Sequence, residues 1–194
     1  MTLLSVEHAL QIFKDNVKPI TTVKRVPIIA SLGFVLAEDV CSTLNVPPEH
    51  CSAMDGYALC TDDLIAGQKT TLKISQRVMA GYEAQPFERG TAVRIFTGGQ
   101  VPAGANAVVM QEDCDVDGDS VILPAAIEPG NNVRPQGQDI KVGDVVLVKG
   151  QKLFAQHIGQ LASVGIAEVA IYRPLRVAAL STGDELVDPG SPLA

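Results

Sequence analysis

The chain has 194 residues, and its 15 Lys and Arg against 22 Asp and Glu give a formal net charge of −7 at pH 7. Because an acidic surface repels nucleic acid and anionic membranes, we predict neither as a partner. The chain has no run of the roughly 18 apolar residues that a membrane-spanning helix needs, and no basic, signal-like start, so we predict a cytoplasmic protein. Its 4 cysteines form no Cys-x-x-Cys pair, which disfavours a structural zinc site or a redox dithiol.

The N-terminal part predicts one helix followed by extended chain. Ser5 is a preferred N-cap residue, and apolar residues recur at helical spacing over 6–17, before Pro19 ends the pattern. The segment 21–28 alternates loosely, as a strand does, and two consecutive prolines at 47–48 make a rigid connector.

From residue 57 to about 132 the pattern changes to short apolar runs separated by Gly, Pro and Asp. The clearest strands are expected at 72–79, 91–96, 107–111 and 119–123. Strands of this length with turn residues between them are typical of a small β-barrel or sandwich. The dipeptide Asp117-Gly118 predicts a two-residue hairpin turn, since both turn positions favour positive φ.

The last part predicts a strand at 145–148, a helix at about 154–164 that stops at Gly165, and a strand at 167–172. The run Leu175–Leu180 is continuously apolar, which favours the first buried strand of a parallel sheet. The residues after it would then lie at the carboxyl edge of that sheet, where open α/β folds bind ligands.

Two segments in the middle of the chain are candidates for a binding site. Ser52-Ala-Met-Asp-Gly-Tyr57 places the carboxylate of Asp55 in a turn of small residues, which suits a hydrated cation; an ordinary capped turn is the alternative. Thr97 and the two glycines after it offer a hydroxyl and backbone donors to an oxyanion, with a wide hairpin loop as the alternative. A P-loop is excluded, because Ala105-Asn106 stands where that motif needs Lys followed by Ser or Thr.

Three further acidic residues stand in loops that follow strands or glycines. Asp139 lies in a polar loop, and Asp184 and Glu185 follow the apolar run near the C-terminus. Acidic residues repel an anionic ligand, so the last two indicate either a bridging divalent ion or a ligand that is not anionic. Capping of a following helix by Asp184 is the alternative.

No serine or cysteine stands in a recognisable nucleophile motif, which leaves hydrolytic triad chemistry unsupported.

Four motifs, in order and with matching gaps, together resemble one family. They are Ser52–Ala58, Arg94–Gly98 with Val108–Glu112, Asn132–Ile140 and Ser181–Leu186. The chain is similar over essentially its whole length to MoeA, the molybdopterin molybdenumtransferase family, which is related to the E domain of gephyrin. It departs from the family in having Glu49-His50-Cys51 where Phe-Asp-Asn is usual, and Asn106 in place of a commonly acidic residue.

The resemblance implies an α+β fold. It implies an elongated MoeA N-terminal region over 1–172, with a discontinuous part at about 1–45 and 133–172 and an inserted small β-barrel-like domain at about 46–132. Residues 173–194 would contribute the first strand of a truncated central α/β molybdopterin-binding domain. We therefore expect the chain to be a fragment of a longer protein.

The family's activity implies insertion of molybdate into adenylated molybdopterin, with Mg²⁺ and with release of AMP. By motif match the catalytic residues would be Asp55, Thr97, Asp139 and Glu185. Of these, Asp55 and Glu185 would bind the metal or orient the molybdate, and Thr97 would donate a hydrogen bond to an oxygen. The cofactor-binding residues would be Ser52, Gly98, Gly99, Ser181, Thr182, Gly183 and Asp184.

The resemblance also implies partners. It implies a homodimer with sites at the junction between subunits, and contact with the molybdopterin-adenylating protein of the same pathway. We expect the isolated chain to be inactive, because it would lack the rest of the site. The alternative reading is a non-catalytic dimerisation or scaffold fragment of the same fold.

Overall fold

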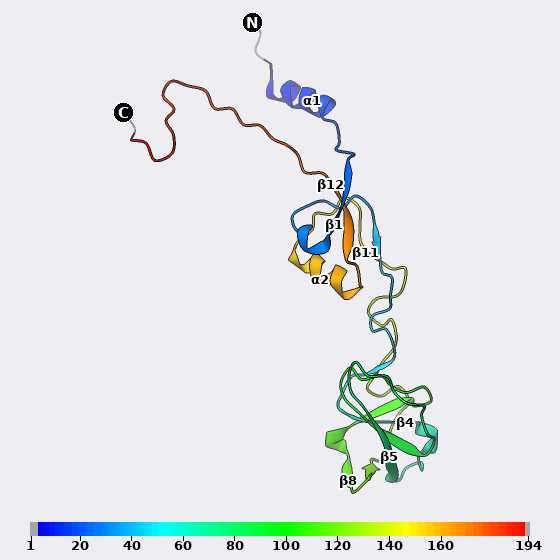
Figure 1. Ribbon diagram of the computed structural model, residues 1–194. Helices are drawn as coiled ribbons and strands as arrows, with labels where there is room; N and C mark the ends of the chain where they lie inside the picture. Colours follow the sequence, from blue (N-terminus) through cyan, green and yellow to red (C-terminus); the bar gives the residue numbers. More distant parts are fainter. Residues whose placement is uncertain (1–3, 193–194) are drawn as a thin grey trace.

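The computed structural model describes residues 4–192, which form two packed bodies joined by a narrow connection (Figure 1). The terminal body contains strands from both ends of the chain, and the sheet body is built from residues 51–134. Segments 42–50 and 135–144 run between them, where Val46 and Ile140 form an isolated antiparallel bridge. Each body has its own buried apolar core.

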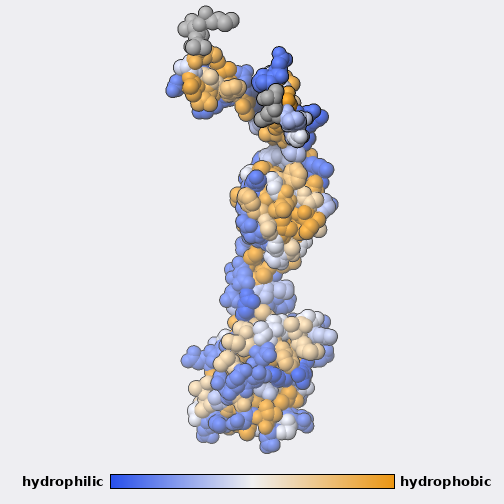
Figure 2. Space-filling view, turned by 90° about the vertical axis from the view of Figure 1, so that its left-hand side faces the viewer, coloured by the Kyte–Doolittle hydropathy of each residue, from blue (hydrophilic) through white to orange (hydrophobic). Residues whose placement is uncertain are grey.

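Helix α1 (Val6–Asn16) forms as predicted and stands apart from both bodies (Figure 1). Its N-cap is Ser5, whose Oγ accepts a hydrogen bond from the His8 N–H at 3.2 Å. None of its residues is buried. Hydrophobic surface therefore lies open on α1, near the top of Figure 2, beside hydrophilic surface of the same helix. The large exposed apolar side chains of α1 and of the residue just after it are Val6, Leu10, Ile12, Phe13 and Val17.

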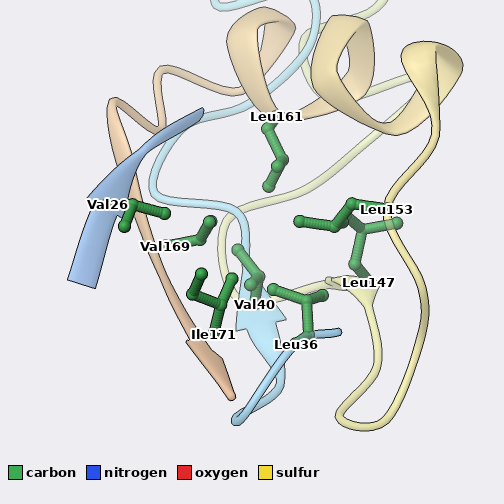
Figure 3. Close-up of a cluster of buried hydrophobic side chains, with 8 residues drawn as sticks. All are labelled: Val26, Leu36, Val40, Leu147, Leu153, Leu161, Val169 and Ile171. Carbon is green, nitrogen blue, oxygen red and sulfur yellow. The ribbon is translucent and has the colours of Figure 1, made fainter. Parts of the chain in front are cut away.

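The terminal body is two short antiparallel strand pairs with a helix packed beside them. Strand β1 (Val23–Pro27) pairs with β12 (Glu168–Tyr172), and β2 (Val40–Cys41) pairs with β11 (Val145–Leu147). Helix α2 (Ala155–Ser163) contacts β11 and the 3-10 helix η1 (Ile28–Ala30). Gly165, at φ 76°, follows α2 in the left-handed conformation that commonly ends a helix. Between these elements lies one apolar core (Figure 3) of Val26, Leu36, Val40, Leu147, Leu153, Leu161, Val169 and Ile171.

The sheet body is a curled six-stranded sheet in the order β7-β4-β6-β5-β9-β8 (Figure 1). Its strands are β4 (Gly56–Leu59), β5 (Thr70–Val78), β6 (Thr91–Ile95), β7 (Ala107–Met110), β8 (Asp115–Asp117) and β9 (Ser120–Leu123). Only β5 and β6 pair in parallel. Because side chains alternate along each strand, both faces carry apolar residues. One face packs the cluster around Tyr57, Ala92 and Val109, and the other packs the cluster around Ala58, Val93 and Val108.

Short elements complete the sheet body where its chain enters and leaves. Strand β3 (Cys51–Ser52) pairs with β10 (Val133–Arg134), next to the connection to the terminal body. Two 3-10 helices, η2 (Thr61–Asp63) and η3 (Gln111–Asp113), follow β4 and β7. These observations confirm the predicted α+β class.

The predicted hairpin forms, but its turn lies one residue later than the sequence indicated. Strands β8 and β9 pair with Asp117 opposite Ser120, so the turn residues are Gly118 and Asp119. Of these two, only Gly118 has positive φ, at 56°. Pairing of Val116 with Val121 sets the register, and the buried Val121 overrides the local preference of the Asp-Gly dipeptide.

The predicted buried strand Leu175–Leu180 is wrong for this structure. Residues 173–192 contain no strand, and Leu175, Val177 and Leu180 are 75%, 84% and 89% exposed. A parallel strand needs neighbours that accept its backbone hydrogen bonds, and residues 4–192 provide none beside this segment.

Of the helices in the described part of the chain, neither α1 nor α2 is long and apolar enough to cross a bilayer.

Candidate active site

Asp55 and Thr97, which are 42 positions apart in sequence, meet at one end of the sheet body. Asp55 directly precedes β4 and Thr97 follows β6 by two residues, and these antiparallel strands pair with Gly56 opposite Ile95. The backbone N–H and the hydroxyl of Thr97 both donate to Oδ1 of Asp55, each at 2.7 Å. Two donors from one residue hold the carboxylate in a single orientation, and the hydroxyl of Thr97 is used for this contact.

The loops that carry this pair are joined through Ser52. The backbone of Ser52 donates to the Gly99 carbonyl at 2.9 Å and accepts from the Gly98 N–H at 2.8 Å. Its side chain is buried and turned inward, where Oγ donates to the Met54 carbonyl and accepts from the Met54 N–H at 3.2 Å. Ser52 therefore shapes the turn that presents Asp55, and its own hydroxyl is occupied within that turn.

Three glycines allow the backbone to approach closely here. Gly56 is not part of the turn of small residues expected around Asp55, because it begins β4 between two other strands. A Cβ on Gly56 would overlap the Val109 carbonyl, and one on Gly99 would come within 2.9 Å of the Phe96 carbonyl oxygen. Gly98 has φ 78°, a conformation that other residues adopt at a cost.

The Thr97 N–H, then the Thr97 hydroxyl, and more weakly the nearby charge of Arg94 lower the pKa of Asp55 below its ordinary value. The carboxylate is therefore ionised at neutral pH and serves as a hydrogen-bond acceptor or metal ligand, not as a general acid. Among the described residues no hydrogen bond ends on its Oδ2. That oxygen remains available for a ligand.

Arg94 belongs to this site, although the sequence reasoning did not single it out. Its Nη1 donates to the Gly56 carbonyl at 2.9 Å and its Nη2 donates to Oε1 of Gln111. The Gln111 N–H in turn donates to the Asp55 carbonyl at 3.0 Å. In the sequence, Arg94 begins the Arg94–Gly98 motif and lies three residues before Thr97, and this is the signal that pointed to it.

Asp139 lies in the connection between the bodies. Its Oδ2 accepts from Nη2 of Arg134 at 2.6 Å, and both side chains are about half exposed. Its backbone N–H donates to the Val46 carbonyl at 2.9 Å. In the part of the chain that the structure describes, no hydrogen bond links Asp139 to Asp55 or Thr97, so within one chain it forms a separate polar group.

The C-terminal candidates lie away from this pair. The segment with Ser181, Thr182, Gly183, Asp184 and Glu185 is exposed, and it runs beyond the terminal body, at the opposite end of the molecule from β4 (Figure 1). One chain therefore does not bring Glu185 to Asp55. Within residues 4–192, no three His, Cys, Asp or Glu side chains are grouped to hold a metal ion.

Comparison with known proteins places these features in one family. The family model described as the MoeA N-terminal region (domain I and II) matches residues 4–165. A molybdopterin molybdenumtransferase from Haemophilus influenzae is 45% identical over 164 residues, which cover 82% of this chain and 39% of that protein. Molybdopterin molybdenumtransferase 2 from Mycobacterium tuberculosis is 37% identical over 180 residues, 91% of this chain and 44% of that protein.

A solved structure shows the same fold. The crystal structure of a molybdopterin biosynthesis MoeA protein from Pyrococcus horikoshii superimposes with a TM-score of 0.85 and 32% sequence identity, covering 100% of this chain and 50% of that one. The chain thus spans half or less of the length of these relatives.

Proposed function

Since the chain belongs to the family of MoeA N-terminal regions, we propose that it supplies part of the site that inserts molybdate into adenylated molybdopterin with release of AMP. The family that the four motifs predicted is thereby confirmed. The observation that carries the proposal is the ionised carboxylate of Asp55, held by both donors of Thr97 at an exposed end of the sheet.

In this proposal Asp55 is a ligand or acceptor and Thr97 is the residue that positions it. The sequence had suggested that Thr97 donates to a substrate oxygen, and the hydrogen bond to Asp55 supports a positioning role instead. The site fits Mg²⁺ in part, because Mg²⁺ is commonly bound by one or two carboxylates together with phosphate oxygens and waters. When bound, Mg²⁺ would neutralise charge on the phosphate groups of the substrate, with Asp55 as its protein ligand.

The remaining candidates require a second copy of the chain in this proposal. Glu185 and the 181–184 segment would reach Asp55 from the partner of a homodimer, with the sites at the junction between subunits. The exposed apolar side chains of α1 support self-association, since a soluble protein rarely leaves such a face uncovered. We further propose that the molybdopterin-adenylating protein of the pathway delivers the substrate, in the cytoplasm, where the 4 cysteines would stay reduced.

A non-catalytic interaction module is the second candidate, and the uncovered face of α1 is the observation that favours it. The two candidates differ in what Asp55 does. In a module it is only a turn residue, whereas in an insertase its carboxylate is required for the chemistry.

We expect replacement of Asp55 by Asn, at the matching position of a full-length relative, to lower molybdate insertion about a hundredfold or more while leaving the fold intact. The assay follows conversion of adenylated molybdopterin and molybdate to molybdenum cofactor and AMP, with and without Mg²⁺. Asp115→Asn is the matched control, because this carboxylate is 74% exposed on β8 of the same sheet. We expect the 194-residue chain alone to show no turnover.

Replacement of Thr97 tests whether its hydroxyl positions the Asp55 carboxylate, as distinct from a general loss of the fold. Thr97→Ser keeps both donors and should retain most activity, whereas Thr97→Val loses the hydroxyl and should fall between the wild type and Asp55→Asn. Activity of Asp55→Asn within twofold of the wild type would contradict the catalytic proposal and leave the interaction module.

A further inference from the structure

Three side chains form a row across the middle strands of the sheet body. Tyr57 of β4 lies opposite Arg94 of β6, and Arg94 lies opposite Arg77 of β5. The guanidinium of Arg94 lies 5.2 Å from the Tyr57 ring centre and 4.6 Å from that of Phe96, and the guanidinium of Arg77 lies 4.8 Å from the same Phe96 ring. Two guanidinium groups therefore share one aromatic ring on one face of the sheet.

A β-bulge places the second arginine in this row. The pairing of β5 with β6 shifts between Ile74 and Gln76, so that Ser75 is an extra residue. Without it Gln76 would stand beside Arg94; with it Arg77 does. Bulges often re-aim a side chain next to a binding site.

The row borders a hollow of about 410 Å³, lined by Tyr57, Ile74, Ser75, Gln76, Arg77 and Arg94. Pockets that hold small organic ligands usually measure roughly 300–1,000 Å³, so this open hollow has room for more than a bare oxyanion. Its lining combines the two cations with the apolar surfaces of Ile74 and Tyr57. That combination suits an anionic group attached to a small organic body.

The charges of this row are not neutralised by ion pairs. None of the four ion pairs among residues 4–192 includes Arg77 or Arg94. Two like charges side by side across a strand pair repel each other, and a bound dianion would relieve that repulsion. Asp55, whose pKa Arg94 helps to lower, and Glu112, which accepts from Gln111 at 3.1 Å, are the nearby acids that oppose an anion.

We propose that Arg77 and Arg94 form a binding site for a small organic phosphomonoester, in the hollow beside Tyr57. A guanidinium group binds phosphate oxygens through paired, charge-assisted hydrogen bonds, which gives Arg77 an advantage over lysine. Arg94, whose Nη1 and Nη2 already donate to Gly56 and Gln111, contributes mainly its positive charge. The site shares Arg94 with the candidate active site but does not use the Asp55 carboxylate. Binding of an organic phosphate there does not require the proposed insertion activity.

The test measures binding to the 194-residue chain by titration calorimetry at low ionic strength. The probes are AMP, adenosine and inorganic phosphate. We expect saturable binding of AMP, with adenosine and inorganic phosphate each at least about tenfold weaker. Affinity for inorganic phosphate equal to that for AMP would overturn the assignment to an organic phosphate.

Variants identify the residues. Arg77 is exposed, so Arg77→Gln should fold and should weaken AMP binding by about tenfold, and Arg77→Lys should recover only part of the loss. The matched control is Lys73→Gln, an exposed cation on the same strand, which should change the affinity less than twofold. Equal weakening by Lys73→Gln and Arg77→Gln, or no saturable binding to the wild type, would overturn the proposal.

Asp55→Asn distinguishes this site from the insertion site. It should leave AMP binding unchanged or tighter, because it removes a nearby negative charge. Weakening of AMP binding by Asp55→Asn would contradict a site that does not use the Asp55 carboxylate.

Discussion

The carboxylate of Asp55 takes its character from the residues around it. Its pKa is lowered by two donors from Thr97 and by the charge of Arg94, and each of these residues is distant from it in sequence. The small residues around Asp55 indicated a site from the sequence alone. The identity of its partners did not follow, because strand pairing brings them together.

The environment of Cys114, four residues after the end of β7, has the opposite effect: it raises a pKa, whereas the environment of Asp55 lowers one. Burial, followed by the charges of Asp113 and Asp115, raises the pKa of this thiol to about 11. The thiol is therefore neutral at pH 8, and its Sγ donates to the Met110 carbonyl at 3.4 Å. A thiol in this state reacts slowly, since the thiolate is the nucleophile.

We expect iodoacetamide at pH 8 to modify the exposed Cys41 much faster than Cys114. Below its pKa the thiolate fraction of Cys114 grows about tenfold per pH unit, so its rate should rise about a hundredfold from pH 8 to pH 10 if the fold persists. Mass spectrometry of the peptides measures both rates, with the buried Cys51 as an internal control. Equal rates for Cys41 and Cys114 at pH 8 would contradict this account.

At the scale of elements, the helices follow local signals and the sheet follows packing. Helix α2 was predicted from apolar spacing and from Gly165 after its end, and the structure confirms both. The bulge at Ser75 in β5 has no comparable local signal, because it arises from pairing with β6. The hairpin turn at Gly118 lies one residue from its prediction for the same reason.

We expect Leu161→Ala in α2 to destabilise the terminal body by about 2–5 kcal/mol, because this side chain is fully buried and its loss leaves a cavity. Urea unfolding followed by hydrogen exchange measures the change in each body. Amides of β4, β6 and β7 should keep their protection, since the sheet body has its own core. Gln156→Ala, at an exposed position of α2, should cost less than about 0.5 kcal/mol.

At the scale of the whole molecule, α1 and the C-terminal segment extend from the terminal body without packing against either core (Figure 1). The sheet body lies at the other end of an elongated shape. An arrangement in which two copies exchange contacts would cover the apolar side chains of α1 and bring the C-terminal segment of one copy toward the sheet of the other. This is the geometry that the proposed site requires.

We expect the chain to self-associate through α1, with a dimer mass at about 100 µM protein by sedimentation equilibrium. Phe13→Ser should weaken this association, because the side chain is 69% exposed on the apolar side of the helix. Gln11→Ser, exposed elsewhere on α1, should not. A monomeric wild type at this concentration would contradict self-association, and an unaffected Phe13→Ser dimer would exclude α1 as the interface.

The sequence by itself determined the helices and most of the strands, because caps such as Ser5, stops such as Gly165 and apolar periodicity act over a few residues. The α+β class followed from the family resemblance of its motifs. It also located Asp55 and Thr97 as separate candidates. Only the tertiary structure decided that these two touch, that Gly56 is packed between strands, and that Arg94 and Arg77 stand side by side. It also decided that Leu175–Leu180 is not a strand, because strand formation depends on neighbours that a local pattern does not specify.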